Sequence, residues 1–291
     1  MTNFQFIKNR NYAFVFSAIV LVVCIWSLLA NGLNLGIDFT GGSLLHYEFE
    51  AEVSEASARE ALENMGLSGI IQVASENRKE IMITTGFLNE DQKRELRSQL
   101  IANLGSPIAE QGVKRETDIG PTVGQELKDK AMKALMWALL AILIYISARF
   151  DFKFAFSAII ALVHDSVITL GIFSLLQREL NNTFIAAILT LLGYSLNDTI
   201  VVSDRIRENI KKMKNIPFSD MVNKSINQSL SRTLHTSLTT LIPVLILLFF
   251  GGEILKNFAF ALMIGVIVGT YSSIFVVAPV ITIWNKGRVL K

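Results

Sequence analysis

The chain has 291 residues, of which 51% are hydrophobic and only 18% are charged, and its formal net charge is +2. Globular domains carry roughly 25% charged residues, so this composition excludes an ordinary soluble enzyme. The small net charge argues against nucleic acid as a partner, and the single cysteine, Cys24, excludes a disulfide within the chain.

Apolar residues gather in six blocks, each 18 or more residues long and largely uncharged. The blocks are 12–30, 131–148, 154–176, 183–203, 233–250 and 257–283. About 20 residues of helix cross a hydrocarbon core of about 30 Å, so each block is long enough to span a membrane. The sequence therefore predicts a polytopic α-helical membrane protein with six transmembrane helices. Residues 1–32 hold the N-terminus and the first span, and 129–291 hold the other five.

The segment between the first two spans, residues 33–128, is expected to form a small α+β domain outside the membrane. Its signals predict a strand at 45–49, a helix at 54–65, strands at 69–75 and 79–84, a helix from 89, and a strand at 111–118. Asn89 has Gln92 three positions on, which is the capping-box arrangement of a helix N-terminus. The order βαββαβ predicts a ferredoxin-like sandwich.

The basic residues of the short connecting segments set the expected orientation, because cytoplasmic loops of membrane proteins are enriched in Lys and Arg. With the N-terminus inside, thirteen basic residues are cytoplasmic: Lys8, Arg10, Arg149, Lys153, Arg205, Arg207, Lys211, Lys212, Lys214, Lys224, Lys286, Arg288 and Lys291. The opposite short loops carry two, Arg178 and Lys256. We therefore expect an inner-membrane protein with both termini in the cytoplasm and a periplasmic domain at 33–128.

Ionisable residues inside the apolar blocks are the first candidates for function, because an Asp at mid-span costs about 2.5–3.5 kcal/mol on insertion scales. Asp165, beside His164, lies near the middle of the third block, and Asp198 lies five residues before the end of the fourth. Arg232 immediately precedes the fifth block. If that helix extends back to about Ser225, Arg232 lies at nearly the depth of Asp198, and the two are expected to pair.

Polar neighbours of this pair suggest a wet or hydrogen-bonded centre. Ser195 and Asn197 lie close to Asp198 in the sequence, and one face of the fifth helix carries Ser225, Ser229, Arg232, Thr236 and Thr239. Two readings stay open: proton or ion coupling through Asp198 and Arg232, or a structural ion pair that holds helices together. His164 and Asp165 either support a proton relay or simply satisfy local partners. An aspartyl protease dyad of Asp165 and Asp198 is disfavoured, because the two lie about 9 Å apart in depth at 1.5 Å per helical residue.

Two further patterns concern packing. Ala261, Gly265, Gly269 and Ser273 recur every four residues in the sixth block, which predicts a close contact with another helix, either in a partner or in the fourth block. Residues 204–224 mix basic and apolar positions, which predicts an amphipathic interfacial helix on the cytoplasmic side or a solvated loop. No phosphate-binding loop is present, and we expect no catalytic residue, cofactor or metal ligand.

Several strings resemble the SecD/SecF family of protein-export membrane proteins, within the resistance-nodulation-division superfamily, and its SecF members in particular. The strings are 36–42 (GIDFTGG), 118–124 (DIGPTVG), 163–165 (VHD), 193–202 (GYSLNDTIVV), 204–209 (DRIREN) and 231–237 (SRTLHTS). Within the first two, the motif positions with an expected structural role are Asp38, Gly41, Gly42, Gly120 and Pro121. The match covers essentially the whole chain.

The resemblance implies an accessory subunit of the Sec export machinery. Its implied partners are a SecD-like six-helix protein, the SecYEG channel, YajC, YidC and the preproteins themselves. It also implies that a proton or sodium gradient drives late steps of translocation and that Asp198 and Arg232 carry the coupling. Two alternatives remain: half of a proton-coupled exporter of small molecules or lipids, and a membrane scaffold that transports nothing.

Overall fold

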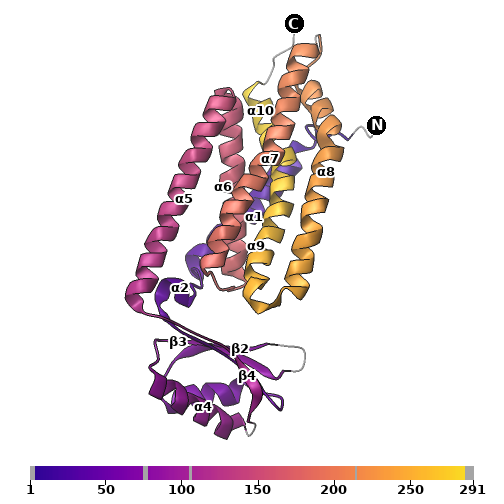
Figure 1. Ribbon diagram of the computed structural model, residues 1–291. Helices are drawn as coiled ribbons and strands as arrows, with labels where there is room; N and C mark the ends of the chain where they lie inside the picture. The colour runs from indigo at the N-terminus through magenta and orange to yellow at the C-terminus, as the bar shows by residue number, and fades with distance from the viewer. Residues whose placement is uncertain (1–3, 75–77, 105–106, 214, 286–291) are drawn as a thin grey trace. The chain divides into compact units, whose positions relative to one another are not determined.

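The computed structural model describes residues 4–74, 78–104, 107–213 and 215–285. The chain divides into two compact units (Figure 1). The sheet unit is Leu35–Met132, and the helical unit is Met1–Asn34 together with Lys133–Lys291. Helix α5 (Pro121–Arg149) begins in the sheet unit and ends in the helical unit.

The sheet unit has the predicted βαββαβ order. Its elements are α2 (Ile37–Thr40), β1 (Gly42–Phe49), α3 (Glu55–Asn64), β2 (Gly69–Ala74), β3 (Glu80–Thr85), α4 (Glu90–Leu104) and β4 (Ile108–Ile119). The strands form one antiparallel sheet in the order β2-β3-β1-β4, which is the ferredoxin-like arrangement. The sequence reading missed the short helix α2. It also started the last strand late, and part of the loop expected at 76–78 lies outside the described residues.

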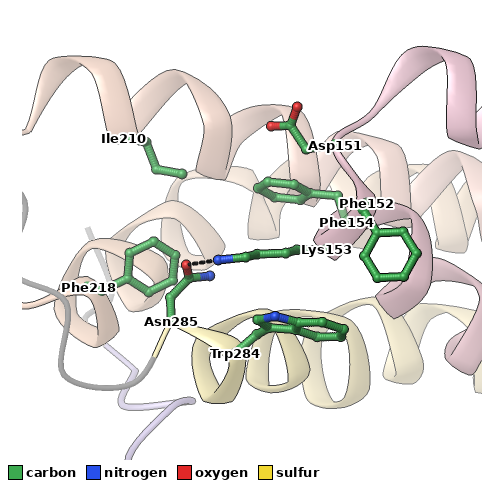
Figure 2. A pocket seen from close by; sticks show the side chains of 8 residues that line it. All are labelled: Asp151, Phe152, Lys153, Phe154, Ile210, Phe218, Trp284 and Asn285. Carbon is green, nitrogen blue, oxygen red and sulfur yellow. Dashed lines mark hydrogen bonds between the residues drawn. The ribbon is translucent and has the colours of Figure 1, made fainter.

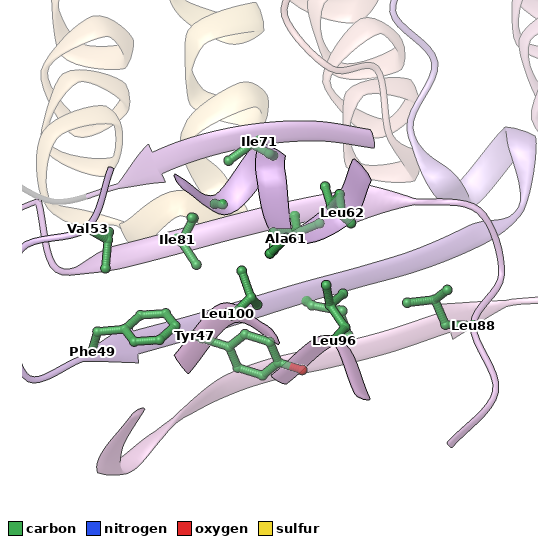
Figure 3. Packing of buried hydrophobic residues seen from close by; sticks show 13 residues of the cluster. Tyr47, Phe49, Val53, Ala61, Leu62, Ile71, Ile81, Leu88, Leu96 and Leu100 are labelled. Carbon is green, nitrogen blue, oxygen red and sulfur yellow. The ribbon is translucent and has the colours of Figure 1, made fainter. Parts of the chain in front are cut away.

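The core of this unit forms because alternate strand residues point to the same face of the sheet. Leu45, Tyr47 and Phe49 of β1 are almost fully buried, and Ile81 and Ile83 of β3 lie beside them. Figure 3 shows Tyr47, Phe49 and Ile81 of this cluster packed with residues of α3 and α4. Each such burial contributes about 1.5–3 kcal/mol, so the core supplies most of the driving force for folding of this unit.

Helix α4 is capped at its N-terminus and is joined to the sheet by an ion pair. The predicted capping box is confirmed: Asn89 N donates to Gln92 Oε1 at 3.0 Å, and Gln92 N donates to Asn89 Oδ1 at 2.9 Å. Lys93, one turn after Asn89, forms an ion pair with Asp118 of β4. The other carboxylate oxygen of Asp118 accepts a hydrogen bond from Ser43. Burial acts to raise the pKa of Asp118, but the hydrogen bonds from Lys93 and Ser43 outweigh it and hold the pKa below its ordinary value.

The two consecutive glycines of the 36–42 string, Gly41 and Gly42, make a turn in which a side chain would clash with neighbouring backbone. Gly41 has φ +73°, and a Cβ there would lie 2.8 Å from Cα of Pro121. Gly42 has φ +137°, and a Cβ there would lie 2.4 Å from the carbonyl oxygen of Thr85. A Cβ on Gly124 would lie 2.7 Å from N of Gly41. The strings 36–42 and 118–124 therefore pack backbone against backbone where Gly41 meets Pro121 and Gly124. A Cβ on Gly120 would meet no atom within 4 Å, and the structural role expected for the motifs as a whole stays a prediction.

The helical unit contains the predicted spans. Six helices are long and apolar enough to cross a membrane: α1 (Arg10–Ala30), α5, α6 (Phe152–Leu175), α7 (Asn182–Lys212), α8 (Phe218–Phe250) and the continuous run Leu255–Trp284. That run begins within α9 (Gly252–Ser272), passes through a π-helical turn at Ser273–Val277, and ends with α10 (Ala278–Trp284). The chain is a multi-pass membrane protein.

The structure corrects the reading of residues 204–224. This segment forms no separate interfacial helix, because α7 continues without a breaker to Lys212 and α8 begins at Phe218. Pro217 lies at the N-cap of α8, where a proline has no amide proton to leave unbonded. The long α8 also confirms that the fifth helix extends back beyond Ser225, so Arg232 lies within it.

Candidate functional site

Helices α6, α7, α8 and α9 lie side by side in the helical unit (Figure 1). Small residues make the closest approach. A Cβ on Gly265 of α9 would lie 2.0 Å from Cδ1 of Leu191 on α7, and a Cβ on Gly269 would lie 3.0 Å from Cβ of Ser195. The predicted small-residue strip of the sixth block is thus confirmed as a helix contact, and its neighbour is the fourth block. This contact brings the polar residues of three helices together.

Asp165 of α6 is fully buried and well supplied with hydrogen-bond donors. Ser195 of α7 donates to its Oδ2 at 2.5 Å, and Ser272 of α9 donates to the same oxygen at 2.8 Å. Its Oδ1 lies 2.9 Å from Nδ1 of His164. One carboxylate therefore joins three helices, and the π-helical turn begins directly after Ser272.

His164 connects this cluster to the first helix. Its ring stacks on Tyr271 at a centroid distance of 6.2 Å. The Tyr271 hydroxyl donates to the carbonyl oxygen of Ala13 at 2.9 Å and lies 3.0 Å from the Ser17 hydroxyl, both on α1. Nε2 of His164 is buried and has no hydrogen-bond partner among the described residues. The arrangement around Asp165 therefore extends from α6 through Tyr271 of α9 to α1.

Asp198 of α7 is also fully buried, but it has far fewer partners. Its Oδ2 lies 3.4 Å from the Ser237 hydroxyl of α8. That hydroxyl has a single proton and is also 2.8 Å from the Thr233 carbonyl oxygen and 2.6 Å from the Thr270 hydroxyl. Oδ1 of Asp198 has no partner within the described part of the chain. Asp198 is therefore an under-bonded carboxylate in the centre of the bundle.

Arg232 does not contact Asp198 in this structure. No ion pair or hydrogen bond between described residues joins the two side chains. Arg232 instead lines an open groove of about 480 Å³ between α7 and α8. The other lining residues are Asn197, Ile200, Val201, Asp204, Arg205, Glu208, Gln228 and Ser229. The groove is rich in charged and amide groups.

The other predicted site residues divide between these features. Ser195 binds Asp165 rather than Asp198, although it is nearer to Asp198 in sequence. Thr236 donates to the carbonyl oxygen of Arg232 at 2.6 Å, so its hydroxyl serves its own helix. Asp165 and Asp198 share no hydrogen bond among those between described residues, which gives a protease dyad no support.

The sequence reading missed four residues of this centre: Ser237, Thr270, Tyr271 and Ser272. The available signal was their hydroxyl groups inside apolar blocks, where polar side chains usually bond between helices. The last three are consecutive and follow the small strip at Gly269. Consecutive residues point in different directions on a helix, so the sequence did not indicate which of them faces Asp165 or Asp198.

A second groove, of about 440 Å³, lies where α6 begins and α7 ends, and Figure 2 shows its side chains. Lys153 extends across it and donates to Oδ1 of Asn285 at 2.9 Å. Aromatic rings form the walls, with Trp284 packed edge-on against Phe152 at a centroid distance of 5.9 Å. The lysine joins the start of α6 to the end of the last span. Across the described residues, no group of three or more His, Cys, Asp or Glu is placed to hold a metal ion.

The fold and the site define a class: a multi-pass membrane protein with a small α+β domain after the first span and two buried aspartates among its helices. Residues 101–287 match the family model "Protein export membrane protein SecD/SecF, C-terminal", and residues 26–53 match the "SecD/SecF GG Motif" model. The chain therefore belongs to the SecD/SecF family. It is 43% identical over 291 residues to "Protein translocase subunit SecF" of Calditerrivibrio nitroreducens, covering 99% of this chain and 96% of that protein.

A longer relative shows what accompanies such a chain. "Protein translocase subunit SecDF" of Thermus thermophilus is 39% identical over 98% of this chain, and this chain spans 39% of that protein. The crystal structure of SecDF from the same organism, titled a translocon-associated membrane protein, superposes with a TM-score of 0.87. The two sequences are 38% identical, and the superposition covers 98% of this chain and 39% of the SecDF chain. The fusion supports a SecD partner. The relatives also identify this chain as an accessory subunit of the Sec translocase, and they bear translocase-subunit names rather than enzyme names.

Proposed function

We propose that this subunit uses an ion gradient, together with a SecD partner, to assist late steps of polypeptide export through the membrane. The observation that carries the proposal is Asp198. A fully buried carboxylate with one unbonded oxygen in a membrane helix is a costly arrangement, and such groups mark ion and proton pathways in membrane proteins. A purely structural role would favour a carboxylate with hydrogen-bond partners on both oxygens, such as the one of Asp165.

The coupling step we infer is an exchange of partners at Asp198. A nearby cation favours an ionised carboxylate, whereas burial without partners favours the protonated form. Arg232 lies on the adjacent helix and remains charged throughout, because an arginine side chain does not lose its proton in proteins. When Arg232 approaches, Asp198 releases a proton; when Arg232 withdraws into its groove, Oδ1 is free to receive one. The lack of an ion pair between Arg232 and Asp198 among the described residues supports the withdrawn arrangement as one of the two states.

The groove beside Arg232 supplies a route for water and ions. Asn197, one residue from Asp198, lines it together with Asp204 and Glu208 of the same helix. We infer that this groove opens to the cytoplasm, because the end of α7 and the start of α8 carry five of the thirteen basic residues assigned to that side: Arg205, Arg207, Lys211, Lys212 and Lys224. Both termini are then cytoplasmic, the sheet unit is periplasmic, and the chain resides in the inner membrane.

The available energy suits a conformational output. One proton crossing a potential of 100 mV releases about 2.3 kcal/mol, which biases a two-state equilibrium roughly fiftyfold. Such a bias can drive a helix rearrangement that favours outward movement of a preprotein. SecYEG is the inferred channel, and YajC and YidC are inferred neighbours of the assembly. The coupling ion is H⁺ or Na⁺.

The test is an export assay in inverted membrane vesicles that contain the intact complex, with and without an imposed gradient. Asp198→Asn is expected to preserve assembly and to abolish the gradient-dependent increment of export. Arg232→Lys should retain part of it, because lysine keeps the charge and loses the planar fork. Asp220→Asn, at an exposed carboxylate in the first turn of α8 that does not line the groove, is the matched control and should keep the full increment.

Retention of the full increment by Asp198→Asn would refute coupling at this site. The residue would then be a structural group, and the scaffold reading would replace the transporter reading. Gradient-driven export of a small molecule or lipid, with no effect on preproteins, would favour the exporter alternative.

A further inference from the structure

The two outer strands of the sheet unit have opposite characters. Edge strands expose unpaired backbone groups, and proteins usually protect them with charged residues, prolines or bulges. β4 has this protection: its pairing with β1 shifts register after His46 and again after Tyr47, and it carries Lys114, Arg115, Glu116 and Asp118. β2 has none of it. Its six residues, Gly-Ile-Ile-Gln-Val-Ala, contain no charge and no proline, and its pairing with β3 is regular throughout.

The free side of β2 is available for pairing in this chain. In an antiparallel ladder, every second residue of an edge strand directs its N–H and C=O away from its neighbour. Among the described residues, no backbone hydrogen bond reaches β2 from any segment other than β3. Ile70 is 46% exposed and Gln72 is exposed as well, so apolar side-chain surface accompanies the unpaired backbone.

We propose that the outer edge of β2 binds an extended segment of the exported polypeptide by adding it to the sheet as a further strand. This proposal rests on the proposed function. Backbone pairing supplies binding energy without reading side chains, whereas pockets for side chains give specificity. An uncharged edge therefore fits a partner that is unfolded and varied in sequence, as exported polypeptides are. The charged and bulged β4 edge does not.

The experiment uses the full chain with its SecD partner in inverted vesicles and a translocation-arrested precursor. A photoreactive amino acid replaces Gln72 of β2 or, as a control, Arg115 of β4. Gln72 faces Met82, Met82 faces His46, and His46 faces Arg115 across the sheet, so the two probes lie in one row at opposite edges. We expect adducts with the precursor from the probe at Gln72 and a several-fold lower yield from the probe at Arg115.

Three variants test whether the edge itself makes the contact. Ile70→Lys places a charge on the edge and should cause a several-fold loss of adduct from the probe at Gln72. Ile70→Thr keeps an uncharged β-branched residue there and should retain the adduct. Val113→Lys introduces the same charge on β4, at a side chain that is 47% exposed, and should also retain it.

Equal yields from both probes, or no loss with Ile70→Lys, would overturn the proposal. An adduct from the Gln72 probe with the SecD partner or with a second copy of this chain would assign the edge to that partner instead. Adduct formation needs no gradient, so it is independent of the Asp198→Asn result. Gradient-dependent export without an adduct would refute the edge proposal alone, and an adduct without gradient dependence would refute the coupling alone.

Discussion

The unequal bonding of the two buried aspartates predicts unequal effects on stability. Asp165→Asn removes the negative charge. The amide oxygen can still accept from Ser195 (2.5 Å) and Ser272 (2.8 Å), because both donate to the same oxygen of Asp165, but each becomes a weaker bond to a neutral acceptor. Hydrogen bonds to charged groups contribute about 1.5–3 kcal/mol in proteins, whereas interhelical bonds in membranes average about 0.6 kcal/mol. We therefore expect Asp165→Asn to destabilise the helical bundle by about 1–3 kcal/mol.

Asp198→Asn is the matched control. The hydrogen bond from Ser237 to Asp198 is 3.4 Å long. The Ser237 hydroxyl lies closer to the Thr233 carbonyl oxygen, at 2.8 Å, and to the Thr270 hydroxyl, at 2.6 Å. Loss of this weak bond, together with removal of a buried charge, should leave stability unchanged or slightly higher. The same substitution chemistry at two buried sites thus has opposite expected outcomes.

The measurement is thermal unfolding of the purified complex in detergent, followed by loss of soluble, monodisperse protein. At about 2–4 °C per kcal/mol, Asp165→Asn should lower the midpoint by about 2–12 °C, and Asp198→Asn should not lower it. Equal midpoints for the two variants would show that the Asp165 bonds contribute nothing net. A larger loss with Asp198→Asn would reverse the assignment of structural and functional aspartates.

Three further predictions concern topology, packing and pH. A cysteine at Asn89 should react with an impermeant thiol reagent from outside, and one at Asn215 should not; the reverse pattern would overturn the orientation. Gly265→Leu should weaken packing of α9 on α7 by about 1–3 kcal/mol in thermal unfolding, while Gly193→Leu should not, because no atom lies within 4 Å of a Cβ there. Because the pKa of Asp118 is held below its ordinary value, its charge stabilises the sheet unit above about pH 4, and that contribution is lost as the pH falls. Asp118→Asn should remove this acid-dependent loss, as measured by unfolding of the full chain between about pH 5 and pH 3.

Much of the fold could be predicted because its signals are local. Apolar blocks longer than 18 residues, strand alternation at 45–49 and the capping box at Asn89 each depend on residues close together in the sequence. The end of α7 and the start of α8 were predicted less well. A charged helix extending beyond the membrane and a charged loop have similar compositions, so residues 204–224 did not show that α7 continues to Lys212.

The site was predicted in its residues but not in its connections. Asp165, Asp198 and Arg232 stand out because ionisable groups are rare in apolar blocks. Their partners depend on how helices rotate and cross, and hydroxyl groups are common enough in such blocks to allow several networks. Ser195 illustrates the difficulty: it lies three residues from Asp198 and one helical turn away, yet it donates to Asp165 of another helix.

The distribution of hydrogen bonds indicates which helices are free to move. Asp165 ties α6 to α7 and α9 through Ser195 and Ser272, so these three helices are held together near the centre of the bundle. Among the described residues, α8 is joined to this group near that depth by Ser237 alone, which forms a neutral hydroxyl pair with Thr270 of α9 at 2.6 Å and lies 3.4 Å from Asp198 of α7. Thr236 and Ser229 of α8 donate to carbonyl oxygens of their own helix. Nearer to the N-terminus of α8, Gln228 accepts hydrogen bonds from Arg205 and Asn209 of α7 at 2.8 and 2.7 Å. We therefore expect α8 to pivot about Gln228 against a fixed group of three helices, and such a pivot would change the distance between Asp198 and the helix that carries Arg232.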